Sequence, residues 1–254
     1  MKFATALPWA GPAGTPGNVG AFAATAEELG FDHVKMGEHL VYPAVIAAPY
    51  PYTPDGRMPP SPSGQRLEML TTFAFLAGQT TRLRFQPSVL LLALRSMDEY
   101  LAALRVLFEG EGEYHGRSIS FPPLIFEPKP VQRPMPIYLG SGAGQASLRR
   151  IARFGQGWTP IGLSAEEVAA ALPRLRDLLA AQNRDGRIGL ELSLGQVTVD
   201  AEPADLLRRL ERLAAIGATS VSVDFGIRSS PVIDDALAAM RHFADTVMTR
   251  AAGL

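Results

Sequence analysis

Residues 137–160 read IYLGSGAGQASLRRIARFGQGWTP, an apolar run followed by a small-residue turn and a helical pattern. The free backbone N–H groups and the positive dipole end of such a helix favour an anion. The stretch therefore predicts either a phosphate-binding turn or an ordinary tight turn of an α/β protein. The residues of the turn are Gly140, Ser141, Gly142, Ala143 and Gly144.

The same alternation of strand-like and helical segments continues on both sides of this stretch. Seven strand–helix units in strict alternation, without a linker, predict one domain over residues 1–254. A parallel α/β barrel is favoured over an open sheet at this length. The apolar end of residues 82–92 predicts a strand buried on both faces, although Pro87 suggests a bulge or strain there. The strands are expected at residues 3–7, 33–36, 82–92, 137–140, 158–161, 190–199 and 220–225.

The composition restricts the class of protein. A hydrophobic content of 47% and a length of 254 residues indicate a globular chain with a full core. A net charge of -1 argues against nucleic acid as a partner. No apolar run of about 20 residues occurs, so we expect no membrane span and a cytoplasmic protein. The absence of cysteine excludes disulfides, thiolate metal sites and cysteine nucleophiles.

A proline-rich segment follows the strand at residues 33–36. Seven of the 21 prolines lie between Pro43 and Pro62, together with Tyr50 and Tyr52 and directly after Tyr42. A loop of this length is usually functional, and it begins where parallel-sheet enzymes keep their chemistry. The segment predicts either an active-site lid or a surface excursion that proline stiffens.

Five segments, in this order, resemble the luciferase-like monooxygenase superfamily, in particular its coenzyme F420-dependent oxidoreductases. They read AEELGFDHVKMGEHLVYP, YPYTPDGR, RLRFQPSVLLL, FEPKPVQRPMPIYLGSG and ASLRRIARFGQGWTP, and with their neighbours cover most of residues 1–165. The resemblance implies a TIM-barrel-like (β/α)8 fold of the bacterial luciferase type, with a flavin or deazaflavin over the carboxyl ends of the strands.

The chain departs from this family after residue 92. About one helix–strand unit, on the order of 30 to 45 residues, is absent between Leu92 and Ser96. This shortens the barrel to about seven strand–helix units and leaves it seven-stranded or incompletely closed, with an edge to protect. In the family that this chain resembles, the strand of this unit ends in a glycine-rich turn that normally contributes cofactor contacts.

The resemblance also implies roles for particular residues. His39, beside Glu38 at the end of a strand, becomes the candidate for acid–base chemistry, with a structural histidine as the alternative. Ser88 and Val89 match the place of a non-proline cis peptide behind the cofactor ring. The turn from Gly140 to Gly144 matches the phosphate loop.

Other residues have weaker assignments. Trp158 lies near a strand end, where it either walls the cofactor pocket or belongs to the core. Because His33, His115 and His242 look peripheral and have no metal-ligand spacing, we predict no metal site.

The leading hypothesis is an oxidoreductase that moves a hydride between coenzyme F420 and a small organic substrate. One alternative is an FMN-dependent luciferase-like monooxygenase, and another is a non-catalytic flavin-binding protein with a shortened barrel. The expected partner is a small-molecule substrate, with a homodimer as the expected assembly because barrel relatives often dimerise.

Overall fold

The computed structural model describes residues 1–38, 66–90, 97–110, 112–125, 129–226 and 232–253. The chain divides into two compact units, one of residues 1–90 with 191–254 and one of residues 91–190. The His39 position and the proline-rich segment from Pro43 to Pro62 lie outside the described residues.

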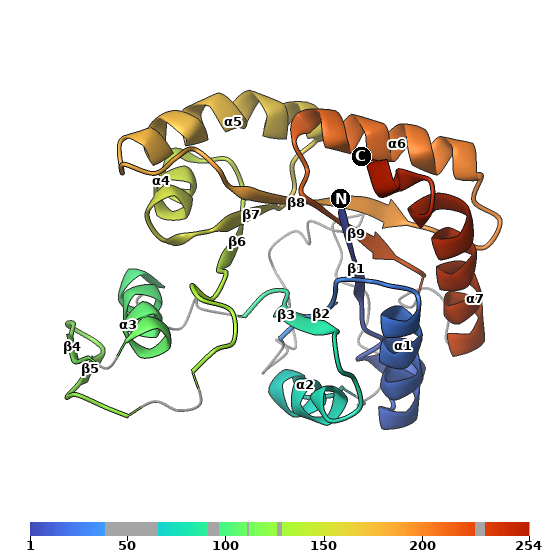
Figure 1. Ribbon diagram of the computed structural model, residues 1–254, viewed down its shortest axis with the longest axis horizontal. Coiled ribbons are helices and arrows are strands. Elements are labelled where there is room, and N and C mark those ends of the chain that lie inside the picture. The colour runs from blue at the N-terminus through green and yellow to red at the C-terminus, as the bar shows by residue number, and fades with distance from the viewer. Residues whose placement is uncertain (39–65, 91–96, 111, 126–128, 227–231, 254) are drawn as a thin grey trace, which may run out of the picture. The chain divides into compact units, whose positions relative to one another are not determined.

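The described elements alternate between strands and helices, as Figure 1 shows. The strands are β1 (Lys2–Ala6), β2 (His33–Met36), β3 (Arg84–Pro87), β4 (Tyr114–His115), β5 (Ser120–Phe121), β6 (Tyr138–Ser141), β7 (Gly157–Pro160), β8 (Gly189–Gln196) and β9 (Ser220–Asp224). The α-helices are α1 (Pro16–Glu28), α2 (Met69–Ala77), α3 (Met97–Glu109), α4 (Gln145–Phe154), α5 (Ala165–Ala180), α6 (Pro203–Ile216) and α7 (Ile233–Phe243). A π-helical turn, Ala244–Met248, follows α7.

Seven strands form one sheet in the order β3-β2-β1-β9-β8-β7-β6, and every neighbouring pair in it is parallel. Strand β8 belongs to both units, because Gly189 and Leu190 pair with β7 whereas the residues from Glu191 onward pair with β9. Strands β4 and β5 form a separate antiparallel hairpin. The strand–helix alternation and the seven parallel strands confirm the predicted TIM-barrel-like α/β fold of about seven units.

Helix boundaries follow local signals in the sequence. The Thr15 hydroxyl accepts the N–H of Asn18 at the start of α1. Ser164 and Glu167 form a complete capping box at the start of α5, which satisfies two backbone donors that would otherwise be exposed. Helix α6 ends at Gly217, whose φ of 102° lies in the left-handed region that favours glycine.

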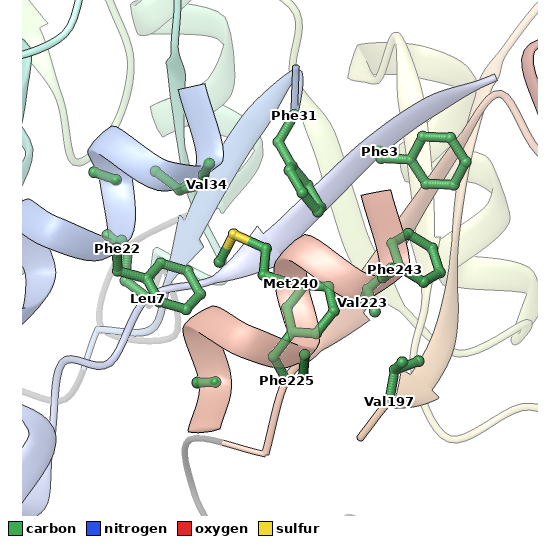
Figure 2. Close-up of a cluster of buried hydrophobic side chains, with 14 of the residues drawn as sticks. Phe3, Leu7, Phe22, Phe31, Val34, Val197, Val223, Phe225, Met240 and Phe243 are labelled. Atoms are coloured by element: carbon green, nitrogen blue, oxygen red, sulfur yellow. The ribbon is translucent and has the colours of Figure 1, made fainter. Parts of the chain in front are cut away.

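The core of the first unit lies between one face of its strands and the helices α1 and α7 (Figure 2). Phe243 packs edge-on against Phe3 and Phe225, with ring centroids 5.7 Å apart in both pairs. Each such buried side chain contributes about 1.5–3 kcal/mol of transfer free energy. Since side chains alternate along a strand, residues next to these core positions face the other side of the sheet.

Strand β3 differs from its prediction. Within its described part it has half-buried and exposed side chains, and it pairs with β2 alone among the described strands. The strand buried on both faces was expected at the apolar end of residues 82–92. This is wrong for the described part of that end, because Val89 is 39% exposed and Leu90 is half-buried, whereas Leu91 and Leu92 lie outside the described residues. Pro87 is the last residue of this edge strand, a position where proline is tolerated.

Candidate cofactor site

The turn after β6 has the geometry of an anion-binding site within the second unit. Gly144 is the N-cap of α4, and no side chain caps this helix end. Among the described residues, the N–H groups of Gln145, Ala146 and Ser147 have no hydrogen-bond acceptor in the protein. A Cβ atom built onto Gly142 or Gly144 would have no other atom within 4 Å. Open space therefore lies beside these N–H donors.

Ser141 supplies a polar atom that lacks a partner at the same turn. Its hydroxyl is buried and makes no hydrogen bond in the described structure. A buried hydroxyl without a partner is unfavourable, and a ligand oxygen would satisfy it. The open amides and this hydroxyl together fit the phosphate group of a cofactor. Thr159 Oγ1 is likewise buried without a partner, but the strand register places Thr159 on the sheet face opposite Ser141.

Two further residues define the turn. Trp158 is fully buried, and its indole N–H donates to the Ser141 carbonyl at 3.1 Å. This hydrogen bond fixes the backbone at the start of the turn. Its predicted contact with a cofactor stays a prediction. Arg174 of α5 donates to the Ala143 carbonyl at 3.4 Å and brings a cation to the turn. We did not predict Arg174, because contact across 31 residues leaves no local sequence signal.

The carboxyl ends of β2 and β3 carry the other predicted residues, in the first unit. The Ser88–Val89 peptide is cis, which confirms the conformation expected at this position. Gly37 lies beside Trp9 and Ser88, since a Cβ built on it would be 3.4 Å from the Trp9 ring and 3.6 Å from the Ser88 carbonyl oxygen. Glu38 follows directly and is half-buried.

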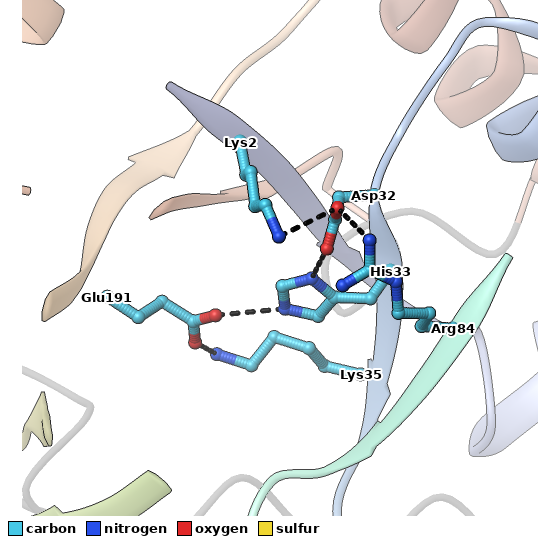
Figure 3. Close-up of polar contacts among 6 residues, drawn as sticks. All are labelled: Lys2, Asp32, His33, Lys35, Arg84 and Glu191. Atoms are coloured by element: carbon cyan, nitrogen blue, oxygen red, sulfur yellow. Dashed lines mark hydrogen bonds and ion pairs between the residues drawn. The ribbon is translucent and has the colours of Figure 1, made fainter. Parts of the chain in front are cut away.

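His33 was predicted to be peripheral, and this was wrong (Figure 3). The residue is only 7% exposed, and its ring bridges two carboxylates. Nδ1 lies 3.1 Å from Asp32 Oδ2, and Nε2 lies 2.9 Å from Glu191 Oε2. The Lys35 ammonium donates to the second oxygen of Glu191.

The strand order explains how this contact forms. In the sheet, β1 and β9 lie between β2 and β8. At this level they contribute the small residues Ala4, Ser220 and Ser222, together with Lys2, whose ammonium pairs with Asp32. Small side chains leave room for His33 and Glu191 to meet over them. One hint of this contact can be found in the sequence. Because successive side chains of a strand point to opposite faces, His33 and Lys35 of β2 lie on the same face.

The network shifts the pKa values of its members. Burial alone would raise the pKa of Glu191, but the hydrogen bond from His33 and the charge of Lys35 outweigh burial and lower it to about 2. Burial opposes protonation of His33 as well, yet Asp32 and Glu191 raise the pKa of His33 above 6.5. These groups form a fixed charge network inside the unit, so we assign them a structural role.

The described ranges contain neither a metal-ligand cluster nor a membrane-spanning helix. No group of three or more His, Asp or Glu side chains there is arranged to hold a metal ion. None of the helices seen in those ranges combines the length and the apolar character needed to cross a membrane.

Comparison with known proteins identifies relatives of this chain. Residues 93–248, more than half of the chain, match the family model of the luciferase-like monooxygenases. An uncharacterized protein of Mycobacterium tuberculosis is 27% identical over 81% of this chain and 84% of its own length. A second uncharacterized protein of that organism is 33% identical over 58% of this chain and 48% of its own length.

Solved structures share the fold. A monooxygenase from Streptomyces bottropensis, RslO1, has a TM-score of 0.75 and 18% identity, over 99% of this chain and all of its own. An F420-dependent secondary alcohol dehydrogenase has a TM-score of 0.70 and 11% identity, over 98% of this chain and 99% of its own. The F420-dependent tetrahydromethanopterin reductase of Methanopyrus kandleri has a TM-score of 0.68 and 12% identity, over the same shares of the two chains.

Proposed function

The chain belongs to the luciferase-like monooxygenase family, and from this premise we propose that it transfers a hydride between coenzyme F420 and a small organic substrate. The observation that carries the proposal is the anion-binding turn between β6 and α4. Its free amides, its open glycines and the unpartnered Ser141 hydroxyl form a place for the cofactor's phosphate.

The chain's own residues would bind and orient the cofactor, which when bound supplies the hydride chemistry. The amides of the first turn of α4 would hold the phosphate, and Arg174 would add a positive charge beside it. Ser88 and Val89, at the end of β3, are proposed to face the ring. His39, with Glu38 before it, is the proposed group that holds or moves a proton.

Two structural neighbours support the choice of F420. The secondary alcohol dehydrogenase was solved with an F420–acetone adduct, and the M. kandleri reductase depends on coenzyme F420. At 11% and 12% identity, these proteins show a fold shared with this chain. That this chain binds F420 is our proposal.

A second candidate function is that of an FMN-dependent monooxygenase. It is favoured by the likeness to RslO1, a monooxygenase with a TM-score of 0.75, and by the likeness to a riboflavin lyase that contains modified FMN, with a TM-score of 0.58. Reduced FMN reacts with oxygen whereas reduced deazaflavin does not, so oxygen consumption separates the two candidates.

The test is equilibrium binding of F420 and of FMN, followed by tryptophan fluorescence. In the variant Gly142→Asp a carboxylate occupies the open space of the turn and repels a phosphate. The matched control is Gly17→Asp, which adds the same charge to the first turn of α1, where a Cβ also meets nothing within 4 Å.

We expect F420 to bind to the wild-type chain and to Gly17→Asp, and to bind at least tenfold more weakly to Gly142→Asp. Binding of FMN alone, with the same response to the variants, would favour the monooxygenase. Failure to bind either cofactor would overturn both. Binding without any hydride transfer would indicate a non-catalytic cofactor-binding protein.

A further inference from the structure

A cavity of about 500 Å³ lies at the amino-terminal ends of β1, β2 and β3, within the first unit. Gly37 and Ser88 are at the other ends of these strands, so the cavity is separate from the candidate cofactor residues. Its lining includes three cations, Lys2, Arg82 and Arg84, and two carboxylates, Glu27 and Asp32.

Both carboxylates are already engaged by the protein. One oxygen of Glu27 accepts the backbone N–H groups of residues 81, 82 and 83 at 2.8, 2.5 and 2.9 Å. Asp32 accepts from His33 and also pairs with Arg84 at 2.9 Å and Lys2 at 3.4 Å, as Figure 3 shows. Both oxygens of Asp32 and one oxygen of Glu27 are therefore already engaged within the protein.

The cations, in contrast, keep unused donors. The Arg82 guanidinium makes one hydrogen bond to protein, from Nη2 to the Glu27 carbonyl at 3.2 Å. The Arg84 guanidinium uses Nη2 for Asp32. Within the described residues, Nε and Nη1 of both arginines have no acceptor. The side chains of Lys2 and Arg84 are 55% and 47% exposed, so these donors are open to a ligand from solvent.

The wall of the cavity adds an apolar surface. The half-buried side chains of Met1 and Met248 supply this surface, whereas the rings of Phe3 and Phe31, 6% and 5% exposed, pack into the core against Phe243 and Phe225. A pocket that combines a few convergent polar groups with apolar walls suits a small molecule with one charged end. Planar guanidinium groups with spare N–H donors suit phosphate oxygens in particular.

We propose that this cavity binds a phosphate monoester with a small apolar body. The phosphate is held by Arg82, Arg84 and Lys2, and the apolar body lies against Met1 and Met248. The site binds its ligand without chemistry, because the amino-terminal end of a parallel barrel serves stability rather than catalysis. The proposal is independent of the cofactor assignment.

The test is calorimetric titration of the full chain with phenyl phosphate, inorganic phosphate and phenol. Because the turn of α4 is a second place for phosphate, every titration is repeated in Gly142→Asp. We expect phenyl phosphate to bind in both backgrounds, inorganic phosphate to bind more weakly, and phenol not to bind.

The deciding variant is Arg82→Gln. The Arg82 guanidinium makes only one hydrogen bond within the described protein, to the Glu27 carbonyl, so we expect the variant to fold. We expect it to weaken phenyl phosphate binding about tenfold, the effect of one lost charge-assisted hydrogen bond. The control Arg212→Gln, on α6 outside this cavity, should leave binding unchanged. Lys2→Met provides a second, independent loss of charge in the cavity.

Several outcomes would overturn the proposal. These are equal affinity in wild type, Arg82→Gln and Lys2→Met, loss of binding in Gly142→Asp alone, or equal binding of phenol and phenyl phosphate. Loss of F420 or FMN binding in Gly142→Asp, with phenyl phosphate binding retained, would leave the cavity assignment standing, so the two sites are judged separately.

Discussion

The replacement Glu191→Gln tests the buried network directly, because it keeps the size of the side chain and removes its charge. Glu191 is 1% exposed and holds both His33 and Lys35. The variant leaves the buried Lys35 ammonium without its counter-charge and His33 without a charged acceptor, and removing one partner of a buried pair costs about 3–5 kcal/mol.

The pKa of Glu191 gives a second estimate of the same quantity. It lies at about 2 in the folded chain against an ordinary 4.5, and each pH unit of difference corresponds to about 1.4 kcal/mol, or about 3 kcal/mol here. Because the folded pKa is the lower one, this stabilisation is present above pH 4.5 and is lost as the pH falls toward 2.

The assay is urea unfolding followed by far-UV circular dichroism. At about pH 7 we expect Glu191→Gln to be less stable than wild type by about 3 kcal/mol, and at about pH 3.5 the difference should shrink by about 1 kcal/mol. The control Glu211→Gln, on the exposed face of α6, should stay within about 0.5 kcal/mol of wild type. A Glu191→Gln variant as stable as wild type, or a difference that does not depend on pH, would refute the reasoning.

Three further changes probe the rest of the framework by urea unfolding. His33→Gln should lose more stability at about pH 6 than at about pH 9, because the raised pKa of His33 makes its contribution present below pH 6.5 and lost as the pH rises through the folded value; an equal loss at both pH values would contradict this. Gly157→Ala should lose about 1–3 kcal/mol, because a Cβ there overlaps the Tyr138 ring; a neutral effect would show that the ring can move. Arg184→Met should lose about 1–2 kcal/mol, since its guanidinium binds three carbonyls at the end of α4, whereas Arg187→Met, 92% exposed, should have little effect.

Local signals in the sequence were enough to predict most helices and strands. The Ser164 and Glu167 pair marks the start of α5, and Gly217 marks the end of α6. Each of these signals acts within four residues, so no knowledge of the tertiary structure is needed. The turn after β6 was predicted for the same reason, because its small residues precede a helical pattern directly.

Contacts between distant segments could not be predicted in this way. His33 and Glu191 are 158 residues apart, and whether a polar strand residue is buried depends on what lies across the sheet. The small size of Ala4 and Ser222 decides this, and their importance emerges only once β1 and β9 are known to lie between β2 and β8. The role of Arg174 at the turn is of the same kind.

Strand β3 forms an edge of the sheet within the described part of the chain, because it pairs with β2 alone there. An exposed strand edge invites pairing with another chain, and natural proteins counter this with short strands, charged side chains and proline. Strand β3 has only four residues, begins with the exposed Arg84 and ends with Pro87, which has no N–H to offer. Because Arg84 also pairs with Asp32 beside the buried network, the residue that protects the edge ties β3 to the core of its unit. The residues of β3 itself thus protect this edge and at the same time join it to the charge network of its unit.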